Sequence, residues 1–135
     1  MATLLSKLKA VSHEATFPVL MALCAVHCFN DLLQSVVSAV YPMLKDDLHL
    51  TFGQIGIVTL VYQIAASVFQ PVVGYTFDRR PYVGSLPLGM VFTAAGIILF
   101  AYSMSLTAVL IAVFLVGIGS STLHPEASRI TSLAS

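Results

Sequence analysis

Two short stretches of this sequence place ionisable side chains inside long apolar segments. His27 and Asp31 lie one helical turn apart in the first segment, and "LHPEASR" (123–129) brings His124, Glu126 and Arg129 into the last. A carboxylate in the middle of a membrane-crossing helix costs at least ~2.5 kcal/mol and typically marks an ion or proton pathway. We therefore predict such a function for Asp31, and Glu126 is the residue of the second stretch that most needs one.

The geometry of the second stretch leaves two interpretations open. Glu126 and Arg129 are three residues apart, which is close enough to pair on a helix. His124 points away from Glu126 on an ideal helix, so the three residues form one cluster only if Pro125 distorts the turn. Arg129 could instead reach the lipid headgroups from the end of the helix, since it lies more than twenty residues beyond Leu106.

Composition identifies the class of protein that positions these residues. The chain has 135 residues, of which 58% are hydrophobic and 9% charged, and its net charge is zero. Soluble domains carry about 25% charged residues. A mean hydropathy of +0.94 with long apolar runs is typical of a polytopic, all-α membrane protein. The sequence has no basic tract, so we expect no nucleic-acid partner.

The apolar runs predict four transmembrane helices after a cytoplasmic leader at residues 1–16, at about 17–44, 52–77, 86–103 and 106–130. Basic residues precede the first span and join the second to the third, whereas Lys45 in the first connection is offset by two aspartates. The positive-inside rule therefore places both termini in the cytoplasm. Thr51 and Gln54 predict a capping box at the start of the second span, and Ser85 predicts an N-cap at the third.

Polar residues recur at helical spacing in two of these spans. In the first, the shared face carries His27, Asn30, Asp31, Gln34, Ser38 and Tyr41. In the second, a softer stripe carries Gln63, Ser67, Gln70 and Gly74, and Pro71 interrupts the hydrogen-bond ladder there. Such stripes face either a partner helix or a polar cavity. The third span is apolar and is expected to be a supporting helix facing lipid. In the fourth, Gly117, Gly119 and two serines form a small surface suited to close packing.

The sequence resembles the amino-terminal part of the fosmidomycin resistance proteins, which are efflux transporters of the major facilitator superfamily. The matching stretches are "HCFNDLLQSVVSAVYPMLK" (27–45), "QIGIVTLVYQIAASVFQPVVGYTFDRRP" (54–81), "LPLGM" (86–90) and "GIGSSTLHPEASR" (117–129). Gly74, Asp78 and Arg79 resemble the superfamily's Gly-x-x-x-Asp-Arg loop between helices two and three. Pro81 replaces the usual glycine there, and the basic residues that normally follow are missing.

The resemblance implies the first four helices of a twelve-helix, proton-coupled antiporter. Such a protein exports an antibiotic or related anion across the bacterial inner membrane, without enzymatic activity or a cofactor. Helices one and four would line its central cavity. The resemblance also implies roles for three sets of residues. The proton-coupling residues would be Asp31, Glu126, His27 and His124, and the substrate contacts would come from Asn30, Gln34, Gln63, Gln70 and Arg129. The cytoplasmic gate would consist of Gly74, Asp78 and Arg79. The transporter's partners would be protons, a small anionic or drug substrate, the lipid bilayer, and either the remaining helices or a second copy.

Three alternatives remain open from the sequence. The first is a metal site, because Cys24, Cys28 and His27 are residue types that bind metals. Their spacing makes only a loose cluster, and a buried cysteine usually behaves as a small apolar side chain. A four-helix haem protein could use His27 and His124 as axial ligands, but counting from the expected helix ends puts the two at different depths. A small membrane subunit without transport activity would use the polar stripe to pack on partners.

Overall fold

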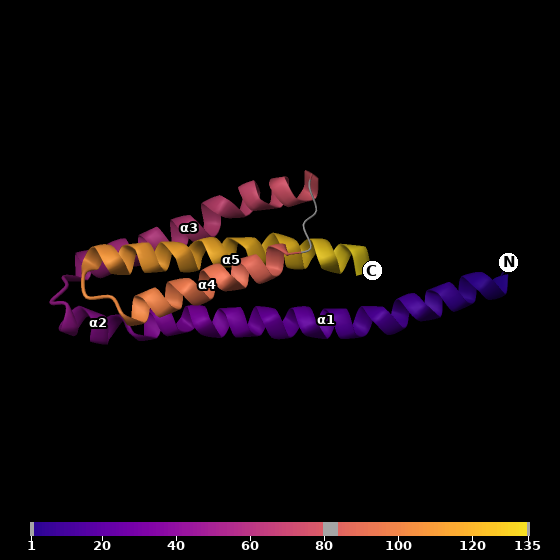
Figure 1. Ribbon diagram of the computed structural model, residues 1–135, viewed down its shortest axis with the longest axis horizontal. Coiled ribbons are helices and arrows are strands. Elements are labelled where there is room, and N and C mark those ends of the chain that lie inside the picture. Colours follow the sequence, from indigo (N-terminus) through magenta and orange to yellow (C-terminus); the bar gives the residue numbers. More distant parts are fainter. Residues whose placement is uncertain (1, 80–83, 135) are drawn as a thin grey trace.

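The computed structural model describes the backbone of residues 2–79 and 84–134, and the side chains of residues 17–76, 79 and 84–125. Its regular structure consists of five helices: α1 (Ala2–Ala39), α2 (Tyr41–Asp47), α3 (Phe52–Arg79), α4 (Ser85–Ala101) and α5 (Leu106–Ala134). Figure 1 shows them as one elongated bundle, with α1 extending beyond it at the N-terminal end. The predicted all-α class is confirmed.

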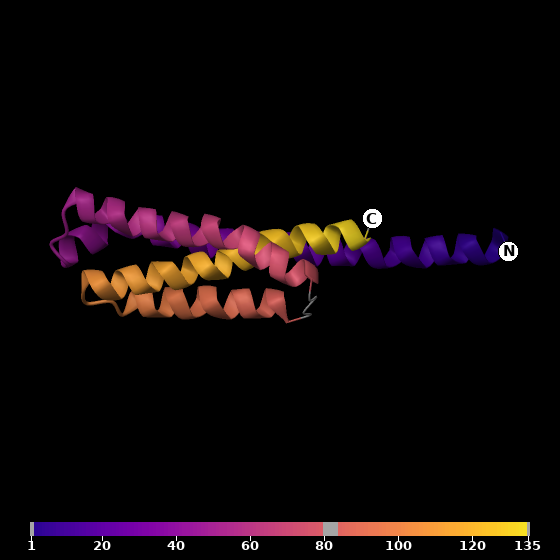
Figure 2. The same ribbon diagram turned by 90° about the horizontal axis from the view of Figure 1, so that it is seen from above.

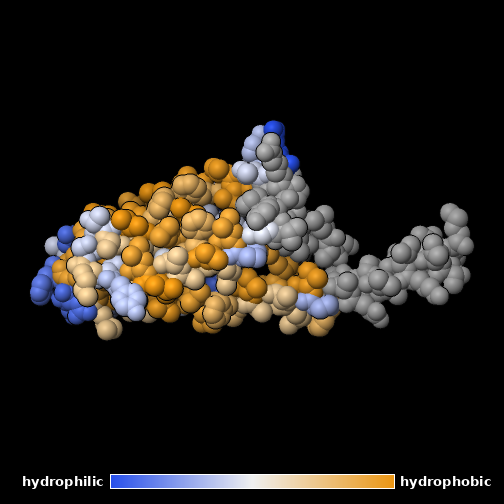
Figure 3. Space-filling model, in the orientation of Figure 1, coloured by the Kyte–Doolittle hydropathy of each residue, from blue (hydrophilic) through white to orange (hydrophobic). Residues whose placement is uncertain are grey.

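Among the residues that the structure describes, three segments are long and apolar enough to cross a membrane: Phe17–Asp47, Phe52–Thr76 and Leu106–Pro125. The fourth helix, Ser85–Ala101, has 17 residues and is therefore about 26 Å long, slightly less than a ~30 Å hydrocarbon core. The crossing of the bilayer by α4 stays a prediction. Figure 3 shows that the face of the bundle seen there is mainly hydrophobic, whereas its α2 end is hydrophilic.

The packed centre of the molecule is α5, which lies between α3 and α4 (Figures 1 and 2). Small residues allow this approach: a Cβ at Gly117 would lie 2.6 Å from the Cβ of Ala65 in α3, and one at Gly119 would lie 2.6 Å from the carbonyl oxygen of Gly89 in α4. The predicted close-packing surface is therefore present. It has two sides, since Gly117 faces one neighbour and Gly119 the other.

The third span combines the predicted lipid-facing surface with a second role. Val91 and Ile98 are exposed, but Thr93, Gly96 and Phe100 are buried against the rest of the bundle. A Cβ at Gly96 would lie 2.8 Å from the carbonyl oxygen of Ala112. One face of α4 thus packs closely on α5 while the other stays apolar and open.

The helix ends test two of the sequence predictions. The capping box is confirmed, because the Gln54 N–H donates to Thr51 Oγ1 at 3.2 Å and the Thr51 N–H donates to Gln54 Oε1 at 2.8 Å. The predicted Ser85 N-cap is wrong: Gly84 occupies that position, and Ser85 is the first helical residue. The Ser85 side chain is 2% exposed and turned into the bundle, so it is not available to cap.

The end of the predicted leader and the prolines Pro71 and Pro125 do not divide the helices. The leader and the first span form one helix from Ala2 to Ala39, with Pro18 inside it. The helices α3 and α5 likewise continue through Pro71 and Pro125. The first apolar segment is instead divided at Val40, where α1 ends and α2 begins with Pro42 in its first turn.

Candidate functional site

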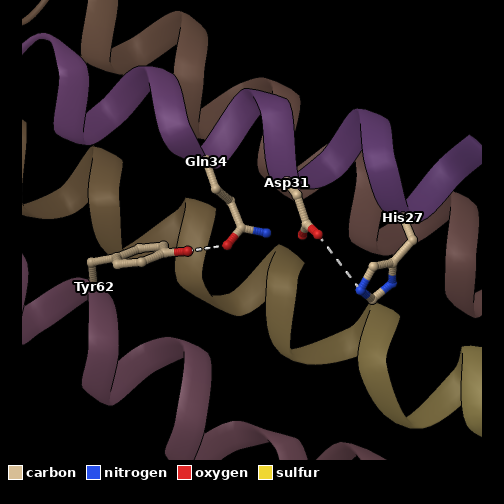
Figure 4. Close-up of polar contacts among 4 residues, drawn as sticks. All are labelled: His27, Asp31, Gln34 and Tyr62. Carbon is tan, nitrogen blue, oxygen red and sulfur yellow. Dashed lines mark hydrogen bonds and ion pairs between the residues drawn. The ribbon is translucent and has the colours of Figure 1, made fainter.

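The predicted proton-coupling residues of α1 lie against α5. His27 Nε2 is 3.7 Å from Asp31 Oδ2, an ion pair when the imidazole is protonated. The His27 ring also stacks on the ring of His124, with centroids 4.8 Å apart and an interplanar angle of 26°. Figure 4 shows Asp31 and His27 on the same side of α1, one turn apart. The structure thus joins three of the four predicted residues across two helices.

This arrangement corrects the prediction that His27 and His124 lie at different depths. That prediction counted residues from assumed helix ends at 17 and 130. The helices instead begin at Ala2 and end at Ala134, so the ends of the apolar stretches are not the ends of the helices. The relative depth of the two rings depends on how far α1 is shifted along α5. This shift cannot be obtained by counting residues.

The stacked rings do not fit the haem alternative. Axial ligation requires a flat macrocycle between two imidazoles, each directing a nitrogen at the iron. Here the rings contact each other face to face at 4.8 Å, which leaves no space for a macrocycle. The residues present therefore do not suit that group.

A second polar contact joins α1 to α3. The Tyr62 hydroxyl donates a hydrogen bond to Gln34 Oε1 (Figure 4). The sequence analysis missed Tyr62. Its position was a usable signal, because Tyr62 lies four residues from the buried Val58 and Ala66 and so shares their face.

A third polar contact joins α1 to α4. Asn30 is fully buried, and the Thr93 hydroxyl donates to its Oδ1 at 3.4 Å. Thr93 is also a residue that the sequence analysis missed, since α4 otherwise looks uniformly apolar. Neither Asn30 Nδ2 nor Gln34 Nε2 has a hydrogen-bond partner among the residues that the structure describes. Two amide donors on successive turns of α1 are therefore available to an acceptor.

The polar stripe predicted on α3 does not join this site. Gln63 and Ser67 are exposed, and Gln70 and Gly74 are half-buried. The face of α3 that packs on α5 carries Val58, Tyr62, Ala65 and Phe69 instead. Gln63 follows Tyr62 directly and is turned by about 100° from it. Within the described part of the chain, Gln63 is therefore directed away from Asn30 and Gln34.

The residues of the predicted gating loop lie within the last turns of α3, which ends at Arg79. Gly74 packs near Pro125 of α5, since a Cβ there would lie 3.4 Å from the proline Cβ. The Arg79 guanidinium is over the ring of Tyr75, 4.5 Å from its centroid. The side chains of Asp78, Glu126 and Arg129 lie outside the described residues, so the pairing of Glu126 with Arg129 stays a prediction.

An open groove of about 670 Å³ runs along α1 beside these contacts. The side chain of Asp31 is 56% exposed in it. Cys24 and Cys28 are free thiols on the same wall. The full lining is Leu23, Cys24, His27, Cys28, Asp31, Leu32 and Ser35. Asp31 and His27 therefore both border the groove, while the His27 ring also contacts α5.

Comparisons with known proteins place this geometry in context. The family model of the Major Facilitator Superfamily matches residues 23–135. The fosmidomycin resistance protein of Escherichia coli (strain K12) is 49% identical over 122 residues, which are 90% of this chain and 30% of that protein. The uncharacterized MFS-type transporter YfnC of Bacillus subtilis (strain 168) is 38% identical over 130 residues, 95% of this chain and 32% of that protein.

The chain spans about a third of the length of these two relatives. No solved structure matches it. The matched region begins four residues before His27, so it contains every residue of the site described above.

Proposed function

The chain belongs to the major facilitator superfamily, and on that basis we propose that it forms the first helices of a proton-coupled antiporter. Its apolar helices and its relatives make it a membrane protein of a transporter family. The proposed cargo is a fosmidomycin-like antibiotic or a related small anion, exported across the bacterial inner membrane. The name of the E. coli relative supports this cargo class.

The observation that carries the proposal is the contact of Asp31 with His27 and of His27 with His124. Asp31 faces the groove, so it can take up a proton there. An ionised Asp31 stabilises a protonated His27, whereas a neutral Asp31 does not. Two stacked imidazolium rings would also repel each other. The protonation state of these residues therefore changes how strongly α1 holds α5, and this is the step that couples protons to movement.

Substrate contacts in this proposal come from the same face of α1. The unpartnered amide nitrogens of Asn30 and Gln34 can donate to an anionic oxygen of the cargo. Arg129 suits a phosphonate, because a guanidinium donates two parallel hydrogen bonds to such a group. Gln63 and Gln70 are assigned to contacts with the rest of the transporter or its cargo, and Glu126 is assigned as a second proton-exchanging carboxylate.

The cytoplasmic end of α3 supplies the proposed gate. Gly74 allows α3 to approach α5 at Pro125. Asp78 and Arg79 at the end of α3 would then latch the closed state. Both termini are assigned to the cytoplasm, as the basic residues indicate.

The test is a chimera in which this chain replaces the matching segment of the E. coli fosmidomycin resistance protein. The chimera is expected to confer fosmidomycin resistance and to move protons in inverted membrane vesicles when the drug is added. Asp31→Asn should abolish drug-dependent proton movement, because an amide cannot release a proton. The matched control is Asp47→Asn, which removes an exposed carboxylate of α2 that lines neither the groove nor the pocket between α2 and α3.

Undiminished proton-coupled export by the Asp31→Asn chimera would remove Asp31 from the pathway. A chimera that is correctly inserted but transports nothing, with or without Asp31, would contradict the transport proposal and favour a non-transporting membrane subunit.

A further inference from the structure

A second pocket lies at the opposite end of the bundle from Arg79, between α2 and α3. Its volume is about 290 Å³, and its lining is Tyr41, Pro42, Lys45, Asp46, Phe52 and Ile55. It is separate from the groove along α1 and takes no part in the proposed proton exchange. Ligand pockets for drug-sized molecules are typically 300–1,000 Å³, so this one suits a small polar group.

The charges in and beside this pocket have both signs. Lys45 Nζ is 3.8 Å from Asp46 Oδ1 and 4.8 Å from the centroid of the Phe52 ring. Asp47 follows directly and is exposed. The one cation is therefore accompanied by two carboxylates, which disfavours a purely anionic ligand. An exposed ion pair of this kind contributes at most about 1 kcal/mol. Lys45 and Asp46 can therefore separate at little cost, so that each binds the opposite charge of a zwitterionic ligand.

The position of the pocket along the helices indicates which kind of zwitterion it would meet, namely a lipid headgroup. The first apolar segment, Phe17–Asp47, has 31 residues. The second apolar segment begins at Phe52, which lines the pocket, so the pocket lies where two candidate membrane spans end, at the level of the headgroups. Tyr41 lines the pocket, and the 82% exposed Phe52 and 78% exposed Tyr102 lie at the same end of the bundle. Aromatic residues, Tyr in particular, gather at this depth.

We propose that the pocket binds the headgroup of an aminophospholipid such as phosphatidylethanolamine. Lys45 would bind the phosphate and Asp46 the ammonium, whose N–H groups donate to the carboxylate. The exposed side chains of Met43 and Phe52 flank the site and offer an apolar surface to the acyl chains. This inference goes beyond the proposed transport function and does not depend on it, because it uses only the position of the chain in a membrane.

The experiment uses the full 135-residue chain in nanodiscs that contain equal amounts of phosphatidylethanolamine and phosphatidylglycerol. The chain is then extracted in mild detergent, and retained lipid is counted by native mass spectrometry. The expected result is several-fold more retained phosphatidylethanolamine than phosphatidylglycerol. Lys45→Gln should reduce retention of both lipids several-fold, because both carry the phosphate. Asp46→Asn should abolish the preference while leaving total retention closer to that of the wild type.

The matched control is Asp47→Asn, which removes a neighbouring carboxylate that does not line the pocket and should keep the preference. Lys45→Arg keeps the positive charge and should retain lipid, so a loss of lipid in Lys45→Gln would report the loss of that charge. Circular dichroism checks that each variant keeps its helices. The proposal is overturned if Asp46→Asn and Asp47→Asn behave alike, or if the two lipids are retained equally by the wild-type chain.

Discussion

Asn30 and Asp31 are neighbours in the sequence but have opposite environments. The neutral amide is fully buried against Thr93, whereas the carboxylate is 56% exposed in the groove. Burying an unpaired charge costs far more than burying an amide with a hydrogen bond. The buried position on α1 therefore carries the neutral residue, and the acid lies in the open groove. The exposure of Asp31 supports the proposed assignment of proton exchange to this residue.

At this scale we predict that the His27–His124 contact stabilises the bundle through its ring faces. Stacked aromatic pairs contribute about 1 kcal/mol beyond their buried area. His124→Ala in the chimera should therefore lower the free energy of unfolding by about that amount, whereas His124→Phe should keep most of it. The measurement is unfolding of the purified chimera in detergent. Equal losses in the two variants would show that the imidazole nitrogens, and not the ring faces, make the contact.

At the scale of elements, the connection between α2 and α3 shows how short helices are terminated in this chain. His49 has a φ of 51°, in the left-handed region. Around it, the Leu50 N–H donates to the Lys45 carbonyl at 2.8 Å and the His49 N–H donates to the Asp46 carbonyl at 3.4 Å. These two bonds form a Schellman motif, with Leu50 buried behind it. The capping box of Thr51 and Gln54 then starts α3 immediately.

The left-handed position predicts a stabilising substitution. An L-residue with a Cβ costs about 1–2 kcal/mol there, and glycine avoids this cost but loses more chain entropy on folding. His49→Gly should therefore raise the free energy of unfolding of the chimera by about 1 kcal/mol. His49→Ala keeps a Cβ and should give no comparable gain. A stabilisation of the same size by alanine would mean that removal of the imidazole, not backbone strain, is responsible.

At the scale of the whole molecule, α5 and α1 are held in the bundle by different kinds of contact. The helices α3 and α4 approach α5 through glycines, with backbone groups in contact. Much of α1 remains exposed, and polar contacts attach it to each of the other long helices: His27 to α5, Asn30 to α4 and Gln34 to α3. The helices α3, α4 and α5 therefore form the close-packed part of the bundle, and polar contacts attach α1 to it.

Glycine substitutions test this division. A Cβ at Gly119 would lie 2.6 Å from both the Gly89 carbonyl oxygen and the Thr93 amide nitrogen, which belong to the backbone and cannot move aside alone. Gly119→Ala should therefore destabilise the chimera by about 1–3 kcal/mol. Gly56 has nothing within 4 Å of its Cβ position, so Gly56→Ala should be neutral or stabilising by up to about 1 kcal/mol. Similar effects of the two substitutions on thermal unfolding would contradict the packing described.

The sequence predicted those features that depend on local periodicity. The length of the apolar runs predicted the helices, and the spacing of residues 27–34 predicted which face of α1 is polar. Thr51 and Gln54 predicted the capping box because its two hydrogen bonds are local. The Ser85 prediction failed because a buried orientation, set by packing against other helices, competed with capping.

The features that the sequence did not predict depend on how helices are offset and rotated against one another. The stacking of His27 on His124 requires the offset between α1 and α5. The bond from Tyr62 to Gln34 requires the rotation of α3, and the same rotation turns Gln63 away from the site. Thr93 was missed because one hydroxyl in an apolar helix has no periodic partner to mark its face.

The central position of α5 has a consequence for biosynthesis. The helices α3 and α4 both find their close-packed partner in the helix that leaves the ribosome after them. Until α5 enters the bilayer, the small-residue faces of α3 and α4, at Ala65 and Gly89, lack the helix on which they pack. A chain halted before α5 therefore holds two helices without the surface on which they pack most closely.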